Sequence, residues 1–90
     1  MQILVTGAAG LIGGEVVRRF AEAGHGVTAL VHRTHRIVGN DGRIVPSHPW
    51  EGAPTPGTAA TLAADVRVPD LGLGVDPRPD LIVHAAAAAL

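Results

Sequence analysis

Residues 6–13 read TGAAGLIG and lie between two segments of different periodicity. A short apolar run, residues 3–5, comes before them, as expected of a strand buried on both faces. After them, residues 11–23 place apolar side chains at helical spacing, and Gly24 stands where a left-handed residue would end that helix. Residues 27–31 are a second apolar run. Strand, glycine turn, helix and strand together predict a βαβ unit.

The three glycines of this turn have different expected roles. Gly7 lets the chain leave the strand in a tight turn, Gly10 leaves the backbone open to a phosphate, and Gly13 allows close packing of the helix. The helix N-terminus adds unpaired N–H groups and a partial positive charge. The segment predicts a site for the pyrophosphate of a dinucleotide, the alternative being a tight turn without a ligand. The candidate contacts are Gly7, Ala9, Gly10, Leu11, Ile12 and Gly13.

The rest of the chain predicts two more strands and a long loop. Residues 34–57 are rich in glycine and proline, which favours a loop where a crossover helix is usual. Within it, residues 36–38 and 43–45 could pair as a short hairpin. Residues 58–64 predict a weak third strand and residues 80–84 a fourth. No repeat or second domain is found, so residues 1–90 are expected to form one domain.

The composition is that of a small domain with a core of small apolar side chains. The 90 residues are 47% hydrophobic and 2% aromatic, carry a net charge of −1 and include no cysteine. These values argue against disorder, nucleic-acid binding and cysteine metal sites. The five histidines lack metal-ligand spacing, so no metal is expected. With no apolar stretch near the ~20 residues that span a bilayer and no signal peptide, we expect a cytoplasmic protein without a membrane partner.

The glycine spacing and two later segments resemble a known superfamily. Gly7 and Gly10 are three positions apart rather than two, which resembles the short-chain dehydrogenase/reductase superfamily in its extended, epimerase-like branch. The Asp-Val pair at residues 65–66 is similar to the acidic pair that lies by the adenine ring. DLIVHAA, residues 80–86, resembles the fourth-strand signature beside the cofactor riboses. The residues so implied at the adenine and riboses are Asp65, Val66, Ala85, Ala86 and Ala87.

This resemblance covers nearly the whole chain and implies its architecture. We expect the incomplete N-terminal half of a Rossmann-type α/β fold, a parallel sheet of four strands in the order 3-2-1-4 flanked by helices. The fourth strand would then be an uncovered edge through which the chain could self-associate. Residues 69–74 and the long loop are similar to thioester-reductase-like and fatty acyl reductase domains within that branch.

The end of the second strand bears on the choice between NAD and NADP. Val31 stands where an NAD-preferring enzyme places a carboxylate, and His32, Arg33 and Arg36 follow it. An arginine can hold a 2′-phosphate that a carboxylate would repel. The sequence therefore favours NADP, held by Arg33, with a solvated strand-end charge as the alternative.

The resemblance implies hydride transfer at a carbonyl or an activated acyl carbon, with catalysis by a tyrosine and a lysine four residues later. The sequence contains neither residue type, so no catalytic residue is assigned. We expect the NADP-binding part of a longer reductase or epimerase. The alternative is a complete, non-catalytic dinucleotide-binding sensor or interaction module.

Overall fold

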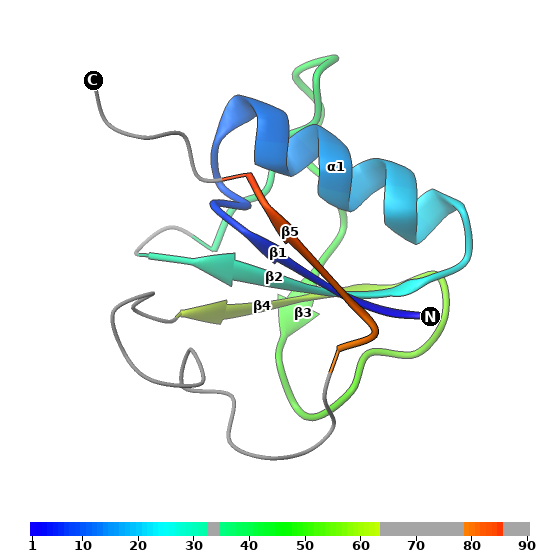
Figure 1. Ribbon diagram of the computed structural model, residues 1–90. Coiled ribbons are helices and arrows are strands. Elements are labelled where there is room, and N and C mark those ends of the chain that lie inside the picture. Colours follow the sequence, from blue (N-terminus) through cyan, green and yellow to red (C-terminus); the bar gives the residue numbers. More distant parts are fainter. Residues whose placement is uncertain (33–34, 64–78, 86–90) are drawn as a thin grey trace.

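The computed structural model describes residues 1–32, 35–63 and 79–85. In these ranges one helix lies across one face of a sheet of five strands (Figure 1). The helix covers the middle of the sheet, as in Rossmann-type α/β folds. The elements are β1 (Gln2–Thr6), α1 (Leu11–Glu22), β2 (Gly26–Val31), β3 (His48–Pro49), β4 (Ala59–Ala63) and β5 (Leu81–His84).

The strand order is β3-β4-β2-β1-β5, and every pairing is parallel. Strands β4, β2, β1 and β5 confirm the expected 3-2-1-4 order. The prediction of four strands was wrong by one, because β3 adds a two-residue edge strand beside β4. Pro49 makes this strand difficult to predict from the sequence, since proline disfavours a strand but is tolerated at a sheet edge. The Trp50 N–H continues the pairing with a hydrogen bond to the Thr61 carbonyl at 2.9 Å.

Helix α1 ends one residue before the predicted Ala23, in a Schellman motif. Gly24 has a φ of +93°, which confirms the predicted left-handed stop. Its N–H donates to the Ala21 carbonyl at 3.0 Å, and the His25 N–H donates to Phe20 at 3.1 Å. The rings of Phe20 and His25 meet edge to face at 5.9 Å. The chain thus turns sharply into β2, which starts one residue earlier than expected.

The main core lies between the sheet and α1. Alternate residues of β1 and β2 point to this face, as the period of two in a strand requires. Part of the core comes from the segment between β2 and β3, which within residues 35–47 contains no helix. Ile37 is fully buried and Val45 is 4% exposed, and they pack where a crossover helix would be usual. The core residues are Ile3, Val5, Ala8, Val17, Val27, Ala29, Val31, Ile37, Val45 and Ala59.

The expected hairpin of residues 36–45 forms in reduced extent. Val38 and Ile44 make a single antiparallel bridge rather than two strands. The Val45 N–H donates to the Ile37 carbonyl at 2.8 Å, and a turn is closed by the Gly42 N–H on the Gly39 carbonyl at 3.0 Å. We call residues 37–45 the hairpin. No helix in the described part of the chain is long and apolar enough to cross a membrane.

Candidate functional site

The glycine turn, residues 7–13, joins the carboxyl end of β1 to the start of α1. Gly7 adopts a φ of +67°, so the turn needs a residue without a side chain at this position. The Gly10 N–H donates to the Gly7 carbonyl at 3.1 Å. The Ala8 N–H reaches across to the Leu30 carbonyl at 3.2 Å and fixes the turn on the end of β2. Within the described ranges, the hydrogen bonds that hold the turn are thus between backbone groups.

Gly13 allows the helix to sit directly on this turn. A Cβ atom at Gly13 would lie 2.1 Å from the Gly7 carbonyl oxygen and 2.9 Å from the Ala8 Cα. The close packing expected of Gly13 is thus present, with the turn backbone as its partner. At Gly10 a Cβ would meet only the Gly7 oxygen, at 3.4 Å, so the space beside Gly10 is otherwise free of the described protein.

The N-terminus of α1 carries backbone N–H groups without helical acceptors. Gly10 is the N-cap, has extended backbone and carries no side chain to cap the helix, and the first turn has no acidic residue. The Gly14 N–H donates to the Gly10 carbonyl at 2.8 Å, which is the first hydrogen bond of the helix. The N–H groups before it have no helical acceptor and point out of the helix end. No acidic side chain in the first turn opposes an anion at this helix end, and the helix dipole favours one.

The other predicted contacts divide into those beside the turn and those elsewhere. Ala9 and Ile12 are exposed next to it, Ile12 at 69%. The Ala85 N–H donates to the Thr6 carbonyl at 3.1 Å, which places Ala85 at the same edge of the sheet. Leu11 opens α1, and His32 and Arg36 are exposed after β2. The predicted residues outside the described ranges are Arg33, Asp65, Val66, Ala86 and Ala87.

Two histidines are within hydrogen-bonding distance of threonine hydroxyls, one at the end of β1 and one in β4. His84 Nδ1 lies 3.2 Å from the hydroxyl of Thr6, which is buried at the last position of β1. His35 Nδ1 lies 2.9 Å from the hydroxyl of Thr61 in β4. Among the described residues no three His, Asp or Glu side chains gather as metal ligands do.

Gly14 forms a close contact that the glycine pattern did not indicate. A Cβ there would lie 2.0 Å from the Val38 carbonyl oxygen, so the hairpin backbone touches the helix backbone. The sequence does contain one sign of this contact, because Gly14 is the second of two adjacent glycines inside a predicted helix. Glycine costs about 1 kcal/mol relative to alanine in that setting, which favours a reason in packing.

Glu15 ties the same helix face to the hairpin. Its carboxylate accepts hydrogen bonds from Arg18 Nε at 3.0 Å, Arg19 Nε at 2.8 Å and the Asn40 backbone N–H at 2.8 Å. The Arg18 guanidinium and then the Asn40 N–H lower the pKa of Glu15 to about 2. Arg18 also contacts Glu22 at 3.0 Å. The helical spacing of apolar residues over 11–23 does not indicate these contacts of Glu15.

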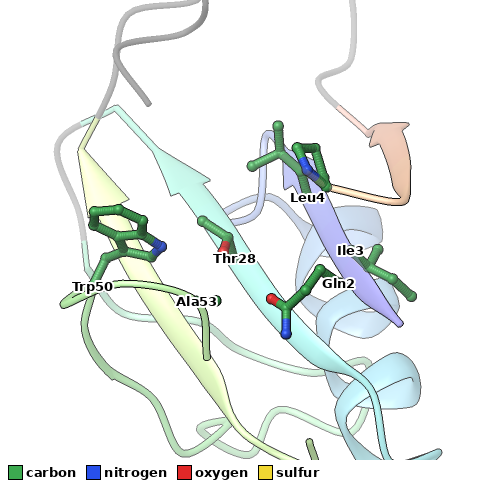
Figure 2. A pocket seen from close by; sticks show the side chains of 7 residues that line it. Gln2, Ile3, Leu4, Thr28, Trp50 and Ala53 are labelled. Carbon is green, nitrogen blue, oxygen red and sulfur yellow. The ribbon is translucent and has the colours of Figure 1, made fainter. Parts of the chain in front are cut away.

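A cavity opens on the sheet face away from α1. Figure 2 shows Gln2 on β1, Thr28 on β2 and Trp50 beside β4 around it. The Gln2 side-chain amide donates to the Pro54 carbonyl at 2.8 Å, which fixes one wall. The cavity lies at the start of β1, whereas the glycine turn follows its end. Its lining residues are Gln2, Ile3, Leu4, Thr28, Trp50, Ala53 and Pro79.

Comparison with known proteins gives a match to one family and a short match to a curated protein. The model of the NAD dependent epimerase/dehydratase family matches residues 3–90. A stretch of 31 residues is 64% identical to an uncharacterized protein of Schizosaccharomyces pombe (strain 972 / ATCC 24843). That stretch is 34% of this chain but only 10% of the yeast protein. No solved structure matches the chain.

Proposed function

We propose that this chain, which belongs to the NAD dependent epimerase/dehydratase family, binds NADP through its glycine turn as part of an enzyme that transfers a hydride. Membership agrees with the resemblance to the epimerase-like branch and with the Rossmann-type fold. The family is NAD(P)-dependent and of the oxidoreductase type. The preference for NADP, the carbonyl or activated acyl substrate and the thioester-reductase-like sub-branch are our proposals.

The observation that carries the proposal is the backbone geometry of the glycine turn. The helix start at Gly10 is uncapped, and Gly13 brings it onto the turn with no side chain between. Oriented N–H groups of this kind hold a pyrophosphate without further rearrangement. Ala85, at the adjacent strand end, would line the ribose. Asp65 and Val66 would flank the adenine, and Ala86 and Ala87 would continue along the ribose.

The preference for NADP is argued from the residues after β2. Val31, at the strand end, is 2% exposed and offers no carboxylate to the ribose hydroxyls. Arg33 would hold the 2′-phosphate, with the exposed His32 and Arg36 on either side in sequence.

Calorimetric titration with NADPH and NADH tests this proposal. We expect the wild-type chain to bind NADPH about tenfold more tightly than NADH, and Arg33→Ala to remove most of that preference, since a bidentate charged contact is lost. Arg43→Ala is the matched control, because that side chain is 88% exposed on the hairpin turn. Absence of heat with either dinucleotide would contradict binding, and tighter NADH binding would contradict the role of Arg33.

We expect the reaction to depend on a catalytic tyrosine and lysine, residue types that this sequence does not contain. A bound dinucleotide would supply or accept the hydride, and the substrate oxygen would need a proton donor, for which this sequence contains no tyrosine. We therefore expect dinucleotide binding but no carbonyl turnover by these 90 residues alone. Turnover of a carbonyl substrate by the isolated chain would contradict this expectation and would point to a catalytic group other than tyrosine and lysine.

The edge strand β5 supports a further proposal, self-association. Within the described ranges β5 pairs only with β1, and Leu81 and Ile82 are 41% and 46% exposed. Such an edge can pair with a second copy. We expect Ile82→Lys to lower the sedimenting mass at high concentration, with Ile44→Lys, on the exposed hairpin, as the control. Equal sedimentation of all three proteins as monomers would contradict the proposal.

A further inference from the structure

The hairpin is docked on α1 immediately beside the glycine turn. Ile37 and Val45 anchor it in the core, and the Val38 carbonyl lies against the bare backbone of Gly14. Gly14 is the direct neighbour of Gly13, which contacts the turn. The first two turns of α1 therefore support the proposed pyrophosphate site and the hairpin together.

Glu15 is the polar part of this docking. Its carboxylate accepts the Asn40 backbone N–H at 2.8 Å, and its side chain is only 16% exposed. Arg18 and Arg19 contact the same carboxylate from within the helix. They keep it charged, and a charged acceptor forms a stronger hydrogen bond with the N–H of Asn40.

A second polar contact holds the chain just before the hairpin. His35 Nδ1 lies 2.9 Å from the Thr61 hydroxyl, which ties this residue to β4. Ile37, two residues later, is fully buried. Arg36 is the exposed residue between these fixed neighbours, five residues after the end of β2. Its backbone is thus held at both sides, and the residue itself is exposed, so that its guanidinium can contact a ligand.

We infer that Glu15 is a positioning residue for dinucleotide specificity, holding the hairpin on α1 so that Arg36 meets the 2′-phosphate of the cofactor. This inference rests on the proposed NADP binding. The alternative is that Glu15 only pairs with the arginines of its own helix. The contact with Asn40 distinguishes the two, because an intrahelical pair has no need of a backbone donor from the hairpin.

Titration of Glu15→Gln with NADPH and NADH tests this inference. We expect NADPH affinity to fall about fivefold and NADH affinity to change less than twofold, because a neutral amide oxygen holds the Asn40 N–H less strongly and the pre-ordering of one phosphate contact is weakened. Glu22→Gln is the matched control, since Glu22 contacts Arg18 but makes no contact with Asn40. It should leave both affinities unchanged. Equal weakening of both dinucleotides by Glu15→Gln would overturn the inference.

Asn40→Pro provides a second route in which Glu15 and its arginine partners stay intact. Residue 40 is the second position of the turn closed by Gly42 on Gly39, where proline is well tolerated. The substitution removes the N–H that Glu15 accepts, and we expect the same selective loss of NADPH. An unchanged NADPH affinity in Asn40→Pro would contradict the inference even if Glu15→Gln failed to fold.

A double-mutant cycle with Arg36→Ala tests whether Glu15 acts through Arg36. In the Arg36→Ala background, Glu15→Gln should cause no further selective loss. Additive losses would place the effect of Glu15 elsewhere and overturn the inference. A wild-type chain that binds neither dinucleotide would instead refute the proposed function itself. Normal dinucleotide binding with no effect of Arg36→Ala refutes only the inference.

Discussion

The glycine turn and the hairpin contact adjacent residues of the same helix by different means. The turn meets α1 at Gly13, backbone against backbone, and its own hydrogen bonds are all between main-chain groups. The hairpin also touches backbone, at Gly14, but it is held by buried Ile37 and by the Glu15 carboxylate. The turn therefore depends on the absence of side chains, whereas the hairpin depends on their presence.

This difference determines how each region can change. A Cβ at Gly13 would lie 2.1 Å from the Gly7 carbonyl oxygen, so no larger residue fits there. Both groups belong to the backbone and cannot rotate away as a side chain could. A side-chain contact such as that of Glu15 can be replaced by another residue that reaches the same donor. The turn is thus suited to a constant ligand group, and the hairpin to features that differ among ligands.

Gly13→Ala should have the largest effect, because it disrupts the contact between the glycine turn and α1, where neither backbone can move aside. The added methyl group collides with the Gly7 carbonyl, and we expect unfolding free energy to fall by about 3 kcal/mol with loss of dinucleotide binding. Urea unfolding and calorimetry measure the two effects. Gly24→Ala is the control, since nothing lies within 4 Å and only its positive φ opposes a side chain. That control should cost about 1 kcal/mol and leave binding intact. Retained binding in Gly13→Ala would refute the rigid-turn interpretation.

Gly14→Ala, one residue later, should have a smaller effect directed at the hairpin. The clash with the Val38 carbonyl costs about 2–3 kcal/mol, and the higher helix propensity of alanine returns about 1 kcal/mol. We expect a net loss of about 1–2 kcal/mol and a weakening of NADPH greater than that of NADH. Hydrogen exchange of the Val45 N–H should increase, because it reports the hairpin hydrogen bond. An equal loss of affinity for NADPH and NADH would contradict a role of the hairpin that is specific to NADPH.

Acid should weaken the hairpin contact through Glu15 and give the smallest effect. The pKa of Glu15 is lowered from 4.5 to about 2, first by Arg18 and then by the Asn40 N–H. A lowered folded-state pKa contributes stability that is complete above pH 4.5 and is lost as the pH falls toward 2. Glu15→Gln should therefore flatten the fall in stability over that range in urea unfolding, whereas Glu22→Gln should keep most of it. Identical pH profiles for Glu15→Gln and wild type would contradict this role.

The sequence revealed the parts of the fold that depend on backbone conformation. Gly7 and Gly24 both have positive φ, which favours glycine, and Gly13 has no room for a Cβ. These constraints, with the apolar runs of β1 and β2, were sufficient for the βαβ unit, whereas the strand order was expected from the family resemblance.

The remaining features depend on long-range contacts of residue types that are usually found on surfaces. Glu15 looks like any charge on a helix face until Asn40 is placed beside it. Strand β3 owes its existence to the β4 edge and not to its own residues, His48 and Pro49. Gly14 gave a signal, an apparently costly glycine, but not the identity of its partner, Val38.

The central position of β1 has a consequence for the order of events during synthesis. β1 pairs on one side with β2 and on the other with β5, whose residues come nearly eighty positions later, as in the pairing of Ile3 with Leu81. Ribosomes add about 5–20 residues per second, so about 3–10 s pass between completion of β2 and the arrival of β5. Throughout that time one side of β1 has no strand partner. The slowest step of folding is therefore expected to be closure of the β1–β5 pair, the contact with the greatest separation along the chain.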